Sequence, residues 1–283
     1  MTTISACRGC GMSELKEFLD LGETPLADAL VTAEVVANPD SEERFPLKVA
    51  FCPVCALVQI TEDVEPEKLF VDNYLYFSSF SDHLLQHSRA HVMNLVETRG
   101  LGPDSLAVEL ASNDGYLLKN FVEAGVPVVG FDPAPDQAEA ANAIGVPTRA
   151  EFFGLDAAKR LRAEGKAADV IIANNVMAHI PDPNDFVAGM AHLLADDGLI
   201  TVENPSVWDL VERCAFDTVY HEHFFYHSCT SVKALVERHG LYLNHVEYFP
   251  DLHGGTNRWH IGHHDEPSPH VLDRLAAERE AGL

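Results

Sequence analysis

Residues 105–133, SLAVELASNDGYLLKNFVEAGVPVVGFDP, decide the fold of this 283-residue chain. The segment begins with a short apolar run, Ser105–Leu110, continues through the mixed stretch Gly115–Glu123, and ends with a second apolar run, Val126–Phe131. Short apolar runs on either side of a helical pattern are typical of a βαβ unit, in which the two strands are parallel. We therefore predict a strand, a helix and a strand at the start of an α/β domain.

The same alternation continues along the chain. Pro135–Ile144 and Pro183–Leu194 read as helices, and Ala168–Ala173 and Gly198–Glu203 read as further strands. Alternation of this kind predicts a doubly wound, Rossmann-like parallel sheet that is covered by helices on both faces. In such sheets, ligands bind at the carboxyl ends of the strands.

The predicted strand ends carry acidic or amide side chains: Glu109, Asp132, Asn174, Asn175 and Glu203. The loop after the first strand, ELASNDG at residues 109–115, has one glycine, whereas the pyrophosphate-binding GxGxxG pattern has three. Asp132 lies where a carboxylate can accept the ribose hydroxyls of either NAD or S-adenosylmethionine. An acidic loop that is poor in glycine favours the cationic, phosphate-free ligand, S-adenosylmethionine, over NAD.

We expect a cofactor pocket to be built from these loops and from two aromatic residues that could flank an adenine. The candidates are Glu109, Ser112, Asn113, Asp114, Asp132, Pro133, Phe152, Phe153, Asn174 and Asn175. Simpler roles remain open for several of them. Asp132 could cap the turn before Pro133, and the two phenylalanines could pack in the core.

Four of the six cysteines form two CxxC pairs, Cys7–Cys10 and Cys52–Cys55. Two such pairs can supply the four thiolates of a tetrahedral Zn²⁺ site, which leaves no coordination position open for catalysis. We therefore expect structural zinc in a small N-terminal domain, residues 1–72. Four free thiols or a redox pair are the alternatives.

Charge and hydropathy restrict the class of partner and the location. The net charge of −25 argues against nucleic acid or an anionic membrane as a partner, because both require basic patches. The sequence has no apolar run of about 20 residues. The N-terminal residues lack the pattern of a signal peptide, so we expect a cytoplasmic protein with reduced cysteines.

A helical connector is predicted between the zinc-binding domain and the α/β domain. Residues 82–98 have the apolar spacing of an amphipathic helix, and the Gly- and Pro-containing residues 100–103 then break the chain. We place the connector at residues 73–102 and the cofactor-binding domain at residues 103–250.

The run YHEHFFY, Tyr220–Tyr226, places four proton-handling side chains in consecutive positions and follows them with aromatic residues. A histidine titrates near neutral pH and can therefore accept a proton at cellular pH. A cluster of this kind beside a cofactor-binding fold suggests an enzyme whose chemistry includes moving a proton.

Taken together, the motifs resemble one known family. They occur in this order: Cys7-x-x-Cys10, Leu21-Gly-Glu-Thr-Pro-Leu26, Cys52-x-x-Cys55-Ala-Leu-Val-Gln59, Tyr74-x-Tyr76-Phe-Ser-Ser79, Glu109–Leu118, Asn174–His179 and Phe216–His223. This pattern is similar to that of the deoxysugar C-methyltransferases, of which the tetronitrose-pathway enzyme is one example, and the likeness covers essentially the whole chain. It implies a class I S-adenosylmethionine-dependent fold with an N-terminal zinc-binding domain. The implied substrate is a nucleotide-linked 4-keto-6-deoxyhexose, methylated at a carbon next to the ketone.

The resemblance also implies roles for individual residues. His223 would be the general base, Tyr220 would hydrogen-bond the keto oxygen, and Glu222 would orient the histidine or bind a sugar hydroxyl. His179 would face the same cleft, and His221 is the alternative to His223 as base. The acceptor would also be contacted by Tyr76, Phe77, Ser79 and Asn204.

One departure from the family keeps other functions open. Members continue into a further domain, so we expect residues 251–283 to be either the beginning of that domain or a short tail. The main alternative is an O- or N-methyltransferase that acts on another small natural-product intermediate. A silent binding scaffold and an NAD oxidoreductase fit less well. The stereochemistry of the acceptor and the oligomeric state are not predicted.

Overall fold

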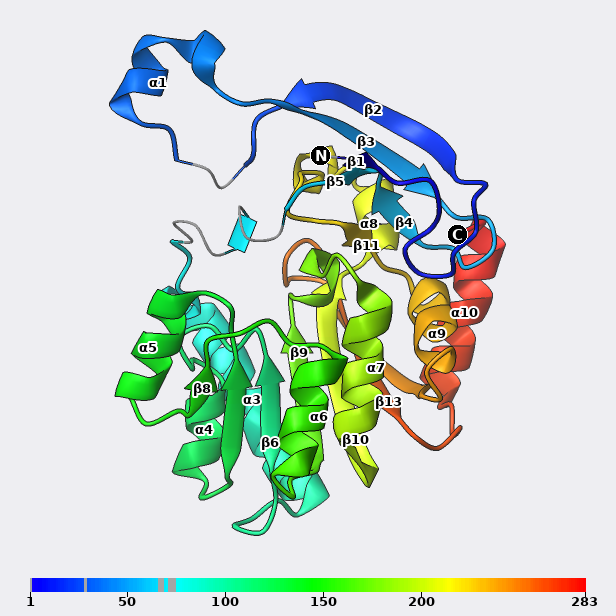
Figure 1. Cartoon of the computed structure of the whole chain (residues 1–283). Coiled ribbons are helices and arrows are strands. Elements are labelled where there is room, and N and C mark those ends of the chain that lie inside the picture. The colour runs from blue at the N-terminus through cyan, green and yellow to red at the C-terminus, as the bar shows by residue number, and fades with distance from the viewer. Residues whose placement is uncertain (1, 28–29, 66–68, 71–74) are drawn as a thin grey trace.

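The structure is a computed structural model that describes residues 2–27, 30–65, 69–70 and 75–283. Figure 1 shows the N-terminal strands above an α/β part whose central sheet is flanked by helices. The described residues include no helix with the length and apolar character that crossing a membrane requires.

The α/β part contains a seven-stranded sheet in the order β12-β13-β10-β9-β6-β7-β8. Its strands are β6 Ala107–Leu110, β7 Val128–Phe131, β8 Thr148–Arg149, β9 Ala168–Asn174, β10 Leu194–Pro205, β12 Tyr242–Phe249 and β13 Thr256–Gly262. The pairs from β10 to β8 are parallel, as predicted, but β13 runs antiparallel to both β10 and β12. The sheet is therefore mixed and not wholly parallel.

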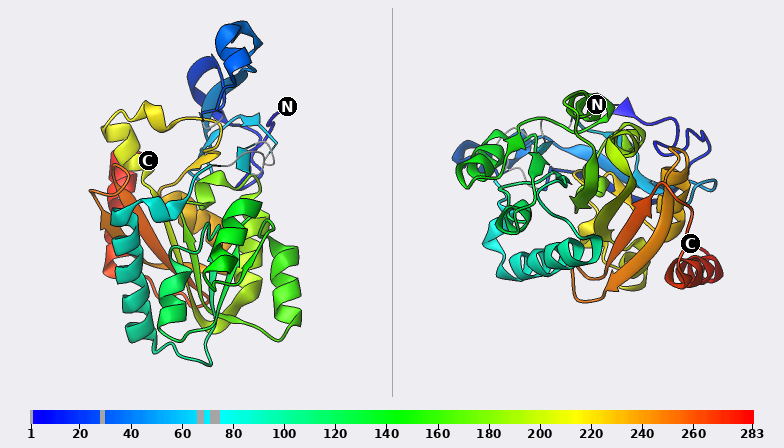
Figure 2. Two further views of the ribbon diagram at one scale, coloured as in Figure 1. Left: turned by 90° about the vertical axis from the view of Figure 1, so that its left-hand side faces the viewer. Right: turned by 90° about the horizontal axis from the view of Figure 1, so that it is seen from below.

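Helices cover both faces of this sheet, as the views in Figure 2 show. One apolar cluster includes residues of α6, α7 and α9 and contains the fully buried Phe186 and Trp259. A second cluster includes residues of α3, α4 and α5 and contains the fully buried Phe121. The helices are α3 Asp82–Arg99, α4 Leu118–Glu123, α5 Pro135–Ala143, α6 Leu155–Ala163, α7 Pro183–Leu193, α9 Cys229–Glu237 and α10 Pro269–Ala281.

The predicted βαβ unit is present, with one shift at its helix. Helix α4 begins at Leu118 and not at Gly115, because residues 111–117 form the turn between β6 and the helix. Gly115 adopts φ +78°, a left-handed conformation that suits glycine and breaks a right-handed helix.

The boundary that we expected at residue 250 falls between two paired strands. Strand β13 hydrogen-bonds to β10 on one side and to β12 on the other, and its Trp259 lies in the core. Helix α10 then contacts α9 and β12. Residues 251–283 therefore complete the sheet and one of its helical layers.

The N-terminal part contains a four-stranded sheet in the order β11-β4-β3-β2. Its strands are β2 Lys16–Thr24, β3 Phe45–Phe51, β4 Val58–Ile60 and β11 Phe225–Tyr226. A separate pair joins β1 Thr2–Thr3 to β5 Glu62–Asp63, and short helices lie at α1 Ala33–Ala37 and α8 Val207–Glu212. Strand β11 comes from the run of histidines and aromatics, so this run connects the N-terminal sheet to the α/β part.

Candidate active site

A cavity of about 1220 Å³ is lined by residues from the ends of strands in the α/β sheet, from the N-terminal part and from the segment at residues 218–227. Seven of the predicted cofactor residues line it: Asn113, Asp132, Pro133, Phe152, Phe153, Asn174 and Asn175. All four predicted catalytic residues also line it: His179, Tyr220, Glu222 and His223. The fold thus brings the two predicted sets together around one space.

The loop after β6 has a constrained backbone. Ala111 and Asn113 adopt positive φ angles of +57° and +48°, which are uncommon for residues other than glycine. The backbone N–H of Asn113 donates to Asp132 Oδ2 at 2.8 Å, and that of Ala134 donates to Asp132 Oδ1 at 2.9 Å. Asp132 therefore holds this loop and the start of α5 in place while it faces the cavity.

Burial dominates the electrostatics of Asp132 and raises its pKa to about 6, although the two backbone hydrogen bonds act in the opposite direction. The pKa of Glu109 is also raised well above its usual value, first by burial and then by the nearby charges of Asp132 and Asp114. Both oxygens of Glu109 are buried and have no hydrogen-bond partner among the described residues. A buried carboxyl of this kind is stabilised by a cationic ligand or a hydrogen-bond donor.

Three predicted cofactor residues, Glu109, Ser112 and Asp114, are buried without being part of the described cavity lining. Ser112 packs against the backbone of Gly130, where a Cβ atom would lie 2.4 Å from Ser112 Oγ. Asp114 Oδ2 accepts a hydrogen bond from the backbone N–H of Ser79 at 3.2 Å. These buried side chains therefore lie on the side of the loop that faces away from the described cavity.

Residues 76–79 dock on this same loop. The Asn113 side chain accepts from the Ser78 N–H at 2.9 Å and donates to the Tyr76 carbonyl at 3.1 Å. Tyr76 lines the cavity, whereas Phe77 stacks on Phe80 with ring centroids 5.6 Å apart. Of the predicted acceptor residues, Tyr76 and Asn204 therefore line the described cavity, and Phe77 and Ser79 do not.

The amide side chains at the ends of β9 and β10 face the cavity with unused hydrogen-bonding capacity. The carboxamide atoms of Asn174 and Asn204 are buried and have no partner within the described chain. The side-chain oxygen of Asn175 is in the same state, and this residue adopts φ +53°. Buried polar atoms are normally satisfied, so these groups favour a bound polar ligand.

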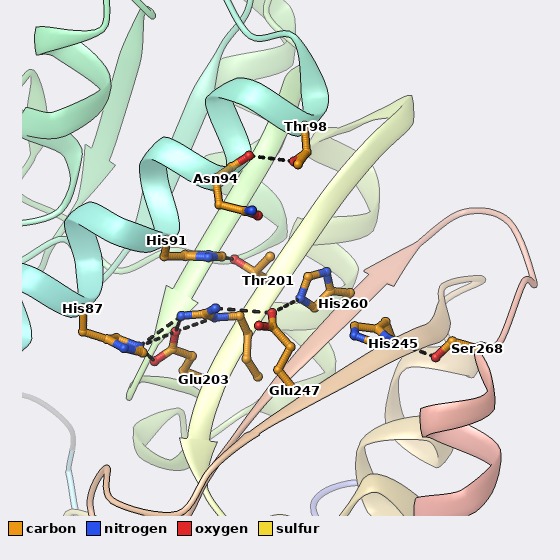
Figure 3. Close-up of polar contacts among 11 residues, drawn as sticks. His87, His91, Asn94, Thr98, Thr201, Glu203, His245, Glu247, His260 and Ser268 are labelled. Atoms are coloured by element: carbon orange, nitrogen blue, oxygen red, sulfur yellow. Dashed lines mark hydrogen bonds and ion pairs between the residues drawn. The ribbon is translucent and has the colours of Figure 1, made fainter.

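Glu203, the remaining strand-end carboxylate, has a different environment (Figure 3). Arg258 Nε donates to Glu203 Oε1 at 2.6 Å, and His87 Nε2 lies 3.0 Å from Glu203 Oε2. Burial acts to raise the pKa of Glu203, but the hydrogen bond with His87 and the charge of Arg258 outweigh it and lower the pKa. Glu203 therefore joins α3, β10 and β13 and is not part of the described cavity lining.

The residues from Tyr220 to His223 form a turn in which the His223 N–H donates to the Tyr220 carbonyl at 3.0 Å. His223 Nδ1 lies 2.8 Å from the Thr218 carbonyl oxygen, and its Nε2 lies 2.9 Å from the Tyr220 hydroxyl. A carbonyl oxygen only accepts hydrogen bonds, so Nδ1 carries the hydrogen. In the neutral imidazole, Nε2 then accepts the Tyr220 proton.

His179 lies next to this pair. Its Nδ1 is 2.6 Å from the Glu222 carbonyl oxygen, and its ring centroid is 4.8 Å from that of His223. Burial lowers the pKa of His179 and outweighs the opposing effect of that hydrogen bond. His179 is thus neutral near pH 7, and its Nε2 is an acceptor.

His221 lies away from this group. Its Nε2 donates to the Pro46 carbonyl at 3.0 Å, and its ring contacts Phe45 on β3. The choice between His221 and His223 as the base stays a prediction, but the His221 imidazole contacts the N-terminal sheet and lies outside the described cavity lining. The physical reason is that residues 221–222 lie in a turn, so the side-chain directions of a strand do not apply.

Sequence reasoning missed His227, which is buried in the cavity wall. Burial lowers the pKa of His227 to about 4. It follows directly on the run YHEHFFY, so extending that run by one residue would have included it. Tyr116 and Ser206 also line the cavity and carried no comparable sequence signal.

The four predicted metal ligands converge. The Sγ atoms of Cys7, Cys10, Cys52 and Cys55 all lie within 4.8 Å of one another. The hydrogen bond with Cys55 is the main cause that lowers the pKa of Cys7 to about 4, and the same bond raises the pKa of Cys55. Four convergent cysteine sulfurs are the donor set of a structural Zn²⁺ site, so the cluster fits Zn²⁺ as the resident ion.

Comparisons with known proteins agree with this arrangement. Residues 85–246 match the model of the family described as "Methyltransferase domain", and residues 7–70 match that of "Putative zinc binding domain". The chain is 37% identical over 283 residues to "C-methyltransferase NovU" of Streptomyces niveus. This alignment covers 99% of this chain and 66% of that protein. It is also 27% identical over 114 residues to "Uncharacterized methyltransferase ML2584" of Mycobacterium leprae (strain TN), covering 40% of this chain and 42% of that one.

Among solved structures, a "putative sarcosine dimethylglycine methyltransferase" from Galdieria sulphuraria is similar with a TM-score of 0.50 and 12% sequence identity. The likeness covers 65% of this chain and 87% of that one, and it concerns the fold alone.

The residues around the cavity fit S-adenosylmethionine. The carboxamides of Asn174 and Asn204 line the cavity with unpartnered polar atoms, and Asp132 lies in the cavity wall, where a carboxylate can accept ribose hydroxyls. The family model covers more than half of the chain. The chain therefore belongs to the S-adenosylmethionine-dependent methyltransferases with the Rossmann-like class I fold, in a form that carries an N-terminal zinc-binding domain.

Proposed function

We propose that the protein methylates a carbon next to a ketone in a nucleotide-linked 4-keto-deoxysugar. The hydrogen-bonded pair His223–Tyr220 in the cavity wall is the observation that carries this proposal. The similarity to a protein named C-methyltransferase supports it. The chain spans 66% of the length of that relative, so the reaction and its acceptor are proposals for this chain.

The size of the cavity supports an acceptor larger than a simple metabolite. A space of about 1220 Å³ exceeds the usual range of small-ligand pockets, roughly 300–1,000 Å³. It can therefore hold a cofactor and a second sizeable molecule together. The partner is then a small-molecule acceptor, and the strongly acidic chain disfavours a nucleic acid.

The pair His223–Tyr220 can perform the proton removal that carbon methylation requires. In the proposed step, the Tyr220 oxygen takes the proton from the carbon next to the ketone while the Tyr220 proton passes to His223 Nε2. The Thr218 carbonyl holds the opposite nitrogen and stabilises the imidazolium that forms. His223 is thus the base, and Tyr220 relays the proton in place of the contact with the keto oxygen that the family resemblance implies.

The enolate oxygen that forms on the acceptor needs a hydrogen-bond donor. The unpartnered carboxamide of Asn204 lines the cavity and supplies a neutral N–H group for this purpose. When bound, S-adenosylmethionine supplies a methyl group activated by its positive sulfur. The cavity walls align the acceptor carbon with that methyl group, and such alignment contributes much of the rate enhancement of transfer reactions.

Proton exchange tests this proposal directly. The protein is incubated in D₂O with a nucleotide-linked 4-keto-6-deoxyhexose and without a methyl donor, and deuterium at the adjacent carbon is measured by mass spectrometry. We expect exchange with the wild-type protein and with the exposed-histidine control His264→Gln, and none with His223→Gln. Absence of exchange together with methylation of a hydroxyl or an amine would instead support the O- or N-methyltransferase alternative.

A further inference from the structure

Gln59 occupies a buried position between the cysteine cluster and the run that carries the candidate base. It lies on β4, which pairs with β3 on one side and with β11 on the other. Gln59 is fully buried, and its backbone is paired with Phe225 of β11. A buried glutamine needs partners for both ends of its amide.

Both ends of the Gln59 amide bind the first cysteine knuckle. Its Nε2 donates to Cys7 Sγ at 3.1 Å, and its Oε1 accepts the backbone N–H of Arg8 at 3.0 Å. A donor to a metal-binding sulfur stabilises the thiolate and fixes its orientation. Gln59 therefore contacts the metal site through its side chain and β11 through its backbone.

Arg8 makes a second connection along the same path. Its guanidinium donates to the carbonyls of Ile60 and Glu62, at 2.8 Å each. It also lies over the rings of Phe224 and Phe225, with its Cζ 5.3 and 6.0 Å from their centroids. The knuckle is thus attached to β4 and to the aromatic half of the run that contains His223.

The distance along the chain from this attachment to the base is short. The Ile60 N–H donates to the Phe224 carbonyl at 3.0 Å, and Phe224 is the residue that follows His223. One residue of extended chain, about 3.3 Å long, separates this attachment from His223. A small displacement of β4 would therefore also displace the imidazole. The hydrogen bond that the Tyr220 hydroxyl donates to His223 Nε2 would then lose its geometry.

We propose that Gln59 is a positioning residue for the pair His223–Tyr220, because its contacts connect the metal-binding knuckle to strand β11. Metal binding by the four cysteines then fixes the position of the His223 imidazole. None of the described cysteines lines the cavity itself. This inference rests on the proposed role of His223 as the base. It assigns the zinc-binding part a function in catalytic geometry as well as in folding.

Two variants separate the contacts of Gln59. Gln59→Leu keeps the approximate size of the side chain and removes both hydrogen bonds, whereas Gln59→Glu keeps the acceptor for Arg8 and places an oxygen against the Cys7 sulfur. Lys48→Gln is the control, because Lys48 lies on the adjacent strand β3 and forms exposed ion pairs with Glu17 and Asp20.

The main readout is the imidazole signal of His223 in ¹H–¹⁵N spectra, assigned by its loss in His223→Gln. In both Gln59 variants, at saturating zinc, we expect this signal to shift while the zinc stoichiometry is unchanged and the S-adenosylhomocysteine affinity stays within about twofold of wild type. We expect kcat to fall roughly 10- to 100-fold with little change in KM, because misplacement by about 1 Å can cost that much. Lys48→Gln should leave the signal and kcat unchanged.

A wild-type measurement covers the case in which a Gln59 variant fails to fold. A chelator is titrated into the wild-type protein, and we expect the His223 signal to shift in proportion to the zinc released. An unchanged signal and kcat in Gln59→Leu, or zinc release without a shift, would overturn the proposal. The spectra need no acceptor, so they test this coupling even if the protein does not methylate a keto sugar.

Discussion

At the scale of single residues, the two hydrogen bonds of His223 fix its tautomer and give the Tyr220 hydroxyl a defined role. Because Thr218 holds Nδ1–H, Nε2 is the acceptor nitrogen, and the Tyr220 hydroxyl lies 2.9 Å from it. Removing either the tyrosine oxygen or the imidazole would therefore break the same proposed proton path.

We predict that Tyr220→Phe and His223→Gln each lower kcat by about 10² or more, within the range usual for loss of general base catalysis. S-adenosylhomocysteine affinity, measured by calorimetry, should change less than about threefold in both. The double variant should lose little beyond either single one, since both residues act in one path. A fully active Tyr220→Phe would show that His223 takes the proton without the tyrosine.

The raised pKa of Asp132 predicts a dependence of cofactor affinity on pH. Its usual value of 3.8 is raised to about 6, so below pH 6 the folded protein without ligand holds Asp132 protonated. Ribose hydroxyls are bound best by the ionised form, which accepts hydrogen bonds at both oxygens. S-adenosylhomocysteine affinity should therefore be constant above pH 7 and fall by about tenfold per pH unit below pH 6.

Calorimetry from pH 5 to 8 measures this dependence. The variant Asp132→Asn should bind S-adenosylhomocysteine more weakly than wild type at pH 8. Its affinity should no longer show the fall below pH 6 that we attribute to Asp132. Glu109→Gln is the companion variant, because the pKa of Glu109 is also raised and its titration must be separated from that of Asp132. An unaltered decline in Asp132→Asn would assign the titration to another group.

The sequence predicted residue types at the site better than it predicted their directions. Strand-end position was enough to place Asp132, Asn174 and Asn175 around one cavity. It was insufficient for Glu203, since its partners His87 and Arg258 come from α3 and β13, which are distant in the sequence. His221 and His223 differ because a turn rotates successive side chains in ways that residue type does not reveal.

At the scale of secondary-structure elements, the buried ion pair between Glu203 on β10 and Arg258 on β13 fastens the antiparallel strand to the sheet. Both side chains are almost fully buried, and Phe249 covers the guanidinium at 4.7 Å. A further contact joins Arg258 Nη1 to Glu247 at 3.3 Å. Loss of one partner would leave the other charge buried without compensation.

We predict that Arg258→Met lowers the free energy of unfolding by about 3 kcal/mol, the cost typical of breaking a buried pair. Combining it with Glu203→Gln should recover part of that loss, because no uncompensated carboxylate then remains. Lys233→Gln, which breaks the exposed pair with Glu237, should change stability by about 0.5 kcal/mol or less. Urea unfolding compares the three variants, and equal effects of Arg258→Met and Lys233→Gln would contradict the assignment.

Element prediction worked where periodicity is strong and local. Helix α3 and strands β7 and β9 lie within about two residues of their predicted bounds. Strand β13 was missed because TNRWHIG alternates weakly and lies in a stretch rich in histidine and charge. Its place inside the sheet depends on pairing with β10, which is a tertiary contact.

At the scale of the whole molecule, strand β11 and the fold of the N-terminal part depend on each other. One apolar cluster combines Cys7, Cys52 and Leu57 with Phe224 and Phe225 from the distant run. The two matched CxxC pairs predicted a metal-binding unit from the sequence alone. The contribution of β11 to that unit could not be predicted, because a two-residue strand has no period of its own.

The arrangement predicts that metal removal acts on one part of the molecule before the other. The N-terminal apolar cluster includes the four cysteines, whereas the two apolar clusters of the seven-stranded sheet contain none of them. With a zinc chelator, we expect hydrogen exchange to accelerate at β3, β4 and β11 and to stay slow at β9 and β10. S-adenosylhomocysteine affinity should fall less than about tenfold, since Asp132 and Glu109 lie on the seven-stranded part. Exchange mass spectrometry resolves the two parts, and simultaneous loss of protection in β9 and β10 would mean that the zinc-binding part supports the entire fold.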